Sequence, residues 1–155
     1  MRHRVTFEDK VVDALIDKSQ IEFPELLVDM EVERMVRQYV ERLRRSVNTE
    51  NELKSILSIT NEEKLRNSYR PRATQTVKRN LVIAKLSQIQ AITASEEEIQ
   101  EQIEAFVKRY GEGADEQRKS LNTEDSKSGI RDWIIARKTI NFLCEQAQLE
   151  DEGSE

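Results

Sequence analysis

The sequence is poor in cysteine, proline and glycine, and it contains no long uninterrupted run of apolar residues. Its single cysteine, Cys144, excludes an intramolecular disulfide framework and a cysteine-based zinc cage, which fits a reducing compartment. No segment approaches the roughly 18 apolar residues that a membrane-spanning helix needs, and residues 1–9 show no apolar signal-peptide region. We therefore expect a soluble, cytoplasmic protein without a membrane partner.

The groups that common catalytic sites need are also scarce. The only histidine is His3, next to a terminus that tends to fray, and Cys144 falls in an apolar stretch typical of a buried structural thiol. The glycines are isolated, so no phosphate-binding loop is present. The acidic run 96–98 is explained by a helix start. We expect no enzyme activity, no nucleotide dependence, no cofactor and no metal site.

Charged and apolar residues dominate what remains. Charged residues make up 35% of the 155 residues and apolar residues 37%, a mixture that favours long solvated helices. The net charge of −5 argues against a duplex nucleic acid as the principal partner. The composition predicts one all-α domain.

Capping patterns predict where several helices begin. Residues 49–52, 60–63 and 95–98 each combine a Ser, Thr or Asn with a Glu three residues later, and residues 6–9 form a weaker version. Pro24 suits the first turn of a helix that should run to Ser46. The apolar face of that helix repeats at helical spacing and comprises Val28, Val32, Met35, Tyr39 and Leu43.

The chain after residue 60 gives further helical predictions. Pro71 should separate two rods, residues 61–70 and 72–92, the second of which carries apolar stripes on two sides. A helix should end near Gly111, and residues 112–128 are interpreted as a loop with one short helix. The last helix is rich in apolar residues after Ile130, and the acidic tail 150–155 is expected to be disordered.

Four segments, taken in order, resemble a known family. The step from a helix through Phe23-Pro24 into a long helix lies within residues 13–28, and a long arm-like helix lies within 65–86. A restart at 94–99 and a closing helix at 138–143 follow with matching spacing. Together they make nearly the whole chain similar to the carboxy-terminal domain of bacterial trigger factor.

This resemblance implies an elongated all-α domain with a body and two protruding helical arms, also described as SurA-like. Arm 1 would span about 40–90 and arm 2 about 94–147, within a chaperone domain of residues 1–149. Nothing in the sequence resembles the family's ribosome-docking loop or its glycine-rich prolyl isomerase domain. Ribosome binding and prolyl isomerisation are therefore expected to belong to parent domains that are absent here. The match begins inside the first body helix, and part of the parent's body is expected to be missing.

The function implied by the resemblance is an ATP-independent chaperone that transiently binds apolar segments of unfolded or nascent polypeptides in the bacterial cytoplasm. Weak apolar patches on the arms would hold clients by avidity. The residues expected to contact clients are Leu53, Ile56, Leu57, Ile59, Leu65, Phe106, Tyr110 and Leu121. For each of them, ordinary packing between helices is the alternative interpretation.

Two rival functions remain open from the sequence. The apolar stripes could be satisfied by self-association, which would make the chain a helical scaffold or oligomerisation module, including a homodimer. The run from Lys64 to Lys85 contains seven cations without an intervening acid and could form an RNA-binding arm. Only Tyr69 supplies an interleaved aromatic, so ion pairs with neighbouring helices are the favoured interpretation of this run.

Overall fold

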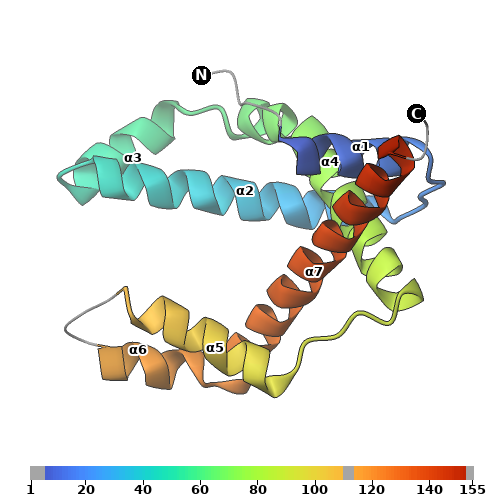
Figure 1. Cartoon of the computed structure of the whole chain (residues 1–155). Coiled ribbons are helices and arrows are strands. Elements are labelled where there is room, and N and C mark those ends of the chain that lie inside the picture. The colour runs from blue at the N-terminus through green and yellow to red at the C-terminus, as the bar shows by residue number, and fades with distance from the viewer. Residues whose placement is uncertain (1–5, 110–113, 153–155) are drawn as a thin grey trace. The chain divides into compact units, whose positions relative to one another are not determined.

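The computed structural model describes residues 6–109 and 114–152, and the described residues contain helices and no strand (Figure 1). The predicted all-α class is confirmed. The helices are α1 (Phe7–Asp17), α2 (Glu25–Ser46), α3 (Glu50–Ile59), α4 (Glu62–Ile89), α5 (Glu96–Val107), α6 (Ala114–Leu121) and α7 (Glu124–Glu152). The expected helix stop at Gly111 lies outside the described residues.

The chain divides into two compact units. Unit 1 combines Met1–Lys18 with Val82–Glu155, and unit 2 is Ser19–Leu81. Helix α4 is shared, because the division falls between Leu81 and Val82 within it. Its first part packs in the core of unit 2, and its last part belongs to unit 1. Of the two predicted apolar stripes, Val77 and Val82 are buried, whereas Ile89 at the end of the second stripe is 66% exposed. The expected arm boundaries at 40–90 and 94–147 stay a prediction.

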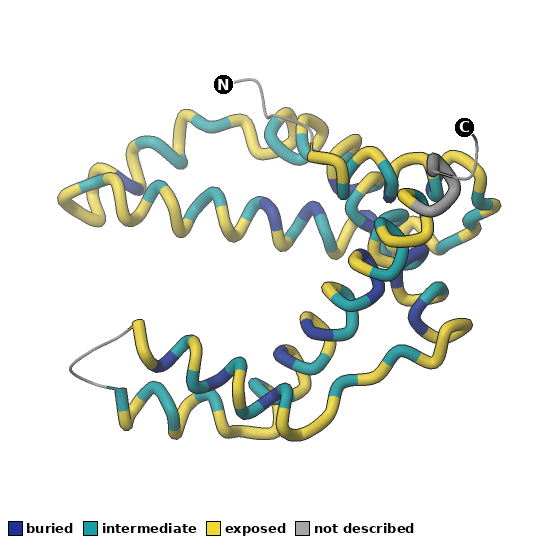
Figure 2. Tube along the Cα trace, viewed as in Figure 1, coloured by how far each residue is buried: buried dark blue, intermediate teal, exposed yellow. Residues whose placement is uncertain are grey.

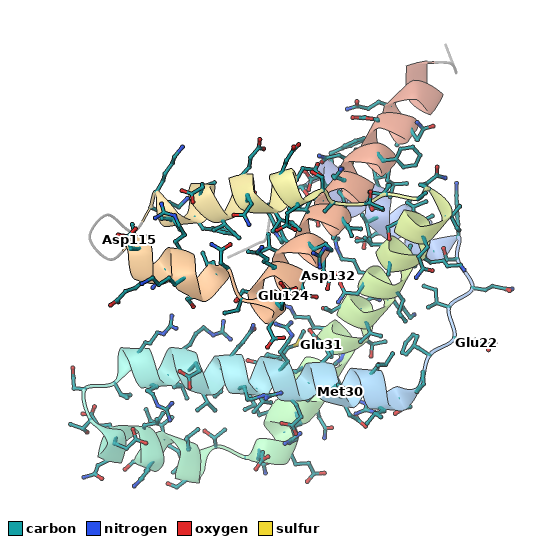
Figure 3. All side chains as sticks on the ribbon, turned by 90° about the horizontal axis from the view of Figure 1, so that it is seen from below. Glu22, Met30, Glu31, Asp115, Glu124 and Asp132 are labelled. Carbon is teal, nitrogen blue, oxygen red and sulfur yellow. The ribbon has the colours of Figure 1, made fainter. Side chains whose placement is uncertain are left out.

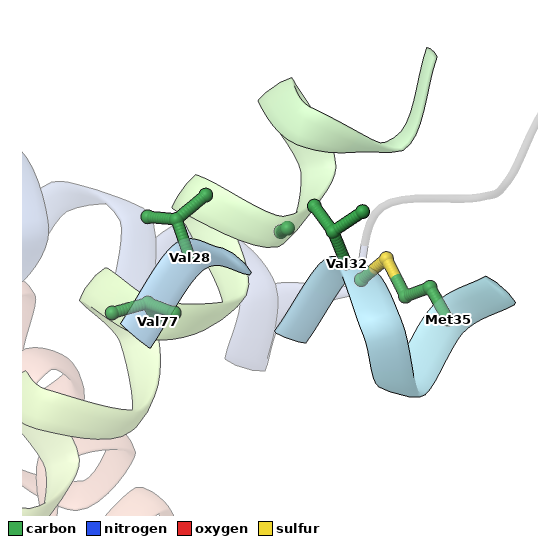
Figure 4. Close-up of a cluster of buried hydrophobic side chains, with 5 residues drawn as sticks. Val28, Val32, Met35 and Val77 are labelled. Carbon is green, nitrogen blue, oxygen red and sulfur yellow. The ribbon is translucent and has the colours of Figure 1, made fainter. Parts of the chain in front are cut away.

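The core of unit 2 is formed where α2 meets α4. Val28, Val32 and Met35 on α2 pack with Ala73 and Val77 on α4, and all five are buried (Figure 4). Burying each of the larger side chains contributes roughly 1.5–3 kcal/mol relative to exposure. The first half of the predicted apolar face is therefore a core face, whereas Tyr39 and Leu43 further along α2 are only half-buried.

Capping explains the limits of α3. The Thr49 hydroxyl accepts a hydrogen bond from the Glu52 amide at 3.2 Å, as predicted for residues 49–52. At the other end Thr60 is the C-cap of α3, and its hydroxyl donates to the Ile56 carbonyl. The cap of α4 therefore comes one residue later than the 60–63 pattern suggested, from the Asn61 side chain, which accepts from the Lys64 amide at 2.8 Å.

The core of unit 1 joins α5, α6 and α7. The buried residues of this core are Ile99, Ile103, Val107, Ile130 and Ile134. Helix α1 contacts α7 and buries Val12 and Ile16. Reciprocal capping boxes at Thr6 and Ser95 begin α1 and α5, which confirms the predictions for residues 6–9 and 95–98.

Pro71 does not separate two rods, because α4 continues through it. The ring removes the amide that would bond to the Asn67 carbonyl, but both residues are exposed and water can satisfy that oxygen. Tyr69 packs against the unit 2 core on one side of Pro71, and Ala73 lies within it on the other. Packing on both sides outweighs the helix-breaking tendency of proline.

The carboxy-terminal part is more helical than expected. Residues 114–121 form the single short helix predicted for 112–128, but α7 already begins at Glu124 and continues to Glu152. Residues 150–152, expected in a disordered tail, thus extend α7, because adding residues to an existing helix needs no new nucleation. Residues 153–155 lie outside the described residues.

Candidate functional site

The residues predicted to bind clients from unit 2 differ widely in exposure. Leu53 is 1% exposed and Ile59 is 84% exposed, although both lie on α3. Ile56, Leu57 and Leu65 are half-buried. The burial pattern along α3 is visible in Figure 2. In this conformation Ile59 offers the most apolar surface of this group and Leu53 the least.

The predicted residues of unit 1 contribute less free surface. Phe106 on α5 is half-buried, and Leu121 at the end of α6 packs against the core of Ile99 and Ile103. Tyr110 lies outside the described residues. The predicted residues divide between two units that each have their own core.

The clearest apolar surface of unit 2 is a groove of about 330 Å³ between α2 and the first turns of α4. Leu26 and Met30 lie one turn apart on α2 and are 65% and 59% exposed. Met30 is labelled on α2 in Figure 3. The other lining residues are Asp29, Val32, Glu33, Glu63, Arg66, Asn67 and Arg70.

Ion pairs fix the two walls of this groove. Arg70 on α4 contacts Glu25 and Asp29 on α2. Arg66 contacts Glu33 on α2 and Glu62 on its own helix. These carboxylates raise the pKa of both guanidinium groups, chiefly through hydrogen bonds from Arg66 to Glu33 and from Arg70 to Asp29.

The same ion pairs bear on the cationic run Lys64–Lys85. Arg66 and Arg70, two of its seven cations, are each shared between two carboxylates. Their charge is therefore largely compensated within unit 2. This geometry favours the salt-bridged interpretation of the run over an RNA-binding face.

Leu26 and Met30 were not among the residues predicted to bind clients. Both fall beside the stripe of Val28, Val32 and Met35, and an apolar pair at i and i+4 outside the main stripe is the signal that could have found them. The sequence alone could not show that Leu26 and Met30 stay exposed on this second face.

A second groove, of about 380 Å³, lies in unit 1 between α5 and α7. Trp133 is 49% exposed at this groove, and Ala105 and Ile134 also line it. Lys138 closes one side, where its Nζ donates to Glu98 Oε1 at 2.8 Å and to the Thr93 carbonyl at 2.8 Å. This pairing lowers the pKa of Glu98.

Cys144 and the acidic side chains are the remaining reactive groups of the described residues. Burial raises the pKa of the half-buried Cys144 thiol, with a further contribution from Glu8, so its nucleophilic thiolate form is disfavoured. Within residues 6–109 and 114–152, no cluster of three or more His, Cys, Asp or Glu side chains could hold a metal ion. No described helix is both long and apolar enough to span a bilayer.

Comparison with known proteins gives a consistent result. The family model described as bacterial trigger factor protein C-terminus matches residues 3–145. Trigger factor from Dehalococcoides mccartyi (strain CBDB1) is 32% identical over 141 residues, which is 91% of this chain and 32% of the relative. Trigger factor from Alkaliphilus oremlandii is 34% identical over 140 residues, which is 90% of this chain and 32% of the relative.

A solved structure agrees with the sequence relatives. The chain is similar to a structure of domains of trigger factor from Thermotoga maritima, with a TM-score of 0.60 and 25% identity, over 89% of this chain and 79% of that one. The chain spans about a third of the length of the curated relatives it matches. It corresponds to the carboxy-terminal part of trigger factor. The chain belongs to the bacterial trigger factor C-terminus family.

Proposed function

We propose that this chain is an ATP-independent chaperone domain that binds apolar segments of unfolded or nascent polypeptides in the bacterial cytoplasm. Membership of the trigger factor C-terminus family supports this function. The observation that carries it is the groove between α2 and α4, where Leu26 and Met30 stay exposed beside ion pairs that hold the walls in place.

The groove explains how binding would be weak and unspecific. Covering Leu26 and Met30 removes apolar surface from water, which is worth about 1–2 kcal/mol for each partly covered side chain. Such a contact forms without a fixed sequence in the client and breaks quickly. Ile59, Ile56, Leu57 and Leu65 supply further apolar area in unit 2, and Phe106 and Leu121 supply it in unit 1. Several weak contacts hold an extended client by avidity, and no nucleotide is required.

The test is the aggregation of a chemically unfolded client after dilution, followed by light scattering, with stoichiometric chain and without nucleotide. The double variant Leu26→Ser/Met30→Ser should reduce suppression at least twofold at equal helix content by circular dichroism. The matched control is Ile89→Ser, because Ile89 is 66% exposed, in the same range as Leu26, but does not line this groove. No suppression by the folded wild-type chain would sink the proposal.

The rival scaffold function predicts a different result in the same preparation. If self-association satisfied the apolar surfaces, a hydrophobic dye would bind weakly and the sample would be a stable oligomer. A monodisperse monomer that binds the dye, with dye binding lowered in Leu26→Ser/Met30→Ser, favours the chaperone.

A further inference from the structure

Among the residues that the structure describes, apolar contact is what holds helix α3 to the rest of unit 2. Of its 10 residues only Leu53 is fully buried. Side-chain hydrogen bonds near α3, such as Asn48 to Glu52 and Ser55 to Asn51, close within residues 48–60. Among the described residues, no hydrogen bond or ion pair joins α3 to another helix.

Helix α5 shows what a firmly attached helix of this chain looks like. Its carboxylates form ion pairs with four lysine or arginine side chains outside α5. Glu96 pairs with Lys127 and Arg131, Glu98 pairs with Lys138, and Glu104 pairs with Arg118. It also buries Ile99, Ile103 and Val107, compared with one buried residue in α3. The contrast marks α3 as the element of low local stability.

The half of α2 that lies beside α3 carries apolar residues that are incompletely covered. Helix α3 contacts α2 and runs beside its carboxy-terminal end (Figures 1 and 3). On this half of α2, Tyr39, Val40 and Leu43 are half-buried, whereas the fully buried residues of α2 lie in the half that meets α4.

The segment that occupies this surface has a recognisable pattern. Leu53, Ile56 and Leu57 lie at i, i+3 and i+4 of α3, which places them on one face of the helix. Amphipathic segments that dock into apolar helical surfaces use the same spacing. A helix of this length is only marginally stable when it is not docked. Another segment with the same apolar spacing can therefore take the place of α3.

We propose that α3 is an internal substitute for a client: it covers a docking surface on the second half of α2 that binds client segments with apolar residues at i, i+3 and i+4. This inference rests on the chaperone function and specifies one of its binding surfaces. A client reaches the surface only when α3 undocks. The apparent affinity for the client is therefore the intrinsic affinity multiplied by the fraction of molecules in which α3 is undocked.

The short connections of α3 provide a release mechanism. Residues 47–49 and 60–61 join it directly to α2 and α4, so undocked α3 stays close to its surface. A tethered segment of this kind competes at an effective concentration in the millimolar range. When a bound client segment dissociates transiently from α2, α3 docks again quickly and blocks rebinding. Clients are therefore released without ATP.

Two variants should move the docking equilibrium in opposite directions. Leu53→Ala removes the buried anchor and should undock α3. Ser55→Ala with Ser58→Ala should strengthen α3, because alanine has the higher helix propensity and both serines are exposed. The second variant keeps the test independent of how well Leu53→Ala folds.

The probe is a synthetic peptide of residues 49–60, titrated into the isotope-labelled chain and followed by NMR at the amides of Tyr39 and Leu43. Leu53→Ala should bind the peptide about tenfold more tightly than the wild type. Ser55→Ala/Ser58→Ala should bind it about two- to fivefold more weakly. An unfolded, carboxymethylated client should displace the peptide from Leu53→Ala.

Equal peptide affinity in all three proteins, or weaker binding to Leu53→Ala, would overturn the inference. Peptide binding that the unfolded client does not compete away would also overturn it, because the surface would then serve α3 alone. The wild-type aggregation assay reports separately on the chaperone function, so failure of that function and failure of this surface give different results.

Discussion

Arg70 Nη1 donates a hydrogen bond to Asp29 Oδ1 at 2.7 Å and ties α4 to α2 at the residue that precedes Pro71. The position before a proline disfavours helical backbone. An anchor at this residue helps α4 to continue where the sequence would otherwise favour a break. It also holds one wall of the groove that exposes Met30.

Replacing the proline should stabilise the chain. Proline in a helix interior costs about 3 kcal/mol relative to alanine, so Pro71→Ala should raise the free energy of unfolding in urea by about 1–3 kcal/mol. The loss caused by Arg70→Met should be smaller in the Pro71→Ala background than in the wild type, because the uninterrupted helix no longer depends on the anchor. Strictly additive effects would show that Arg70 and Pro71 are not coupled.

Truncating the core of unit 1 should be costly. Ile103 is 0% exposed, and Ile103→Ala should lower the free energy of unfolding by about 2–5 kcal/mol. Ile59→Ala, at an 84% exposed position, should change it by less than about 0.5 kcal/mol. Urea unfolding followed by circular dichroism reports both variants, because Ile103 lies in unit 1 and Ile59 lies in unit 2 and both units are helical. Similar losses in the two variants would contradict the assigned burial.

Acid should loosen α5. Lys138, Lys127 and Arg118 lower the pKa of Glu98, Glu96 and Glu104 from the usual value of 4.5. Because the folded pKa is the lower one, the stabilisation is complete above about pH 4.5 and is lost as pH falls through the folded value. Thermal melts between pH 7 and pH 3 should therefore show a falling midpoint.

Glutamine substitutions identify the source of this acid sensitivity. Glu98→Gln should lower the midpoint at pH 7 and flatten its dependence on pH below 4.5. Glu97→Gln is the control, since Glu97 forms no ion pair among the described residues. If both variants kept the full dependence of the wild type, the Lys138–Glu98 pair would not be its cause.

The thiol of Cys144 should react slowly. Burial raises its pKa, so little thiolate is present at pH 7, and the half-buried side chain also restricts access. An aromatic disulfide reagent should label the folded chain at least tenfold more slowly than the urea-unfolded chain. Equal rates in the two states would show an accessible, reactive thiol.

Local patterns in the sequence account for most of the secondary structure. The caps of α1, α3 and α5 were predictable because each satisfies helix-end amides with a side chain three residues away. The apolar stripe Val28–Val32–Met35 was predictable because helical periodicity places it on one face. The resemblance to trigger factor identified the family from the succession of these helices.

The client-binding surface could not be read in the same way. Leu53 and Ile59 lie on one short helix with similar hydrophobicity, yet the first is buried and the second is exposed. Leu26 and Met30 look like ordinary helix residues until the tertiary structure leaves their face uncovered. The exposure of an apolar side chain depends on which helix from elsewhere in the chain packs against it. Periodicity within one helix carries no information about that packing partner.

The sequence by itself determined an all-α chain, the starts of its helices and its family, because these depend on residues within a few positions of one another. Only the tertiary structure decided that α4 runs through Pro71 and that Arg66 and Arg70 form ion pairs with carboxylates of α2. It also decided which apolar side chains stay exposed to solvent. These features depend on contacts between segments far apart in the chain, where packing and ion pairs outweigh local preference.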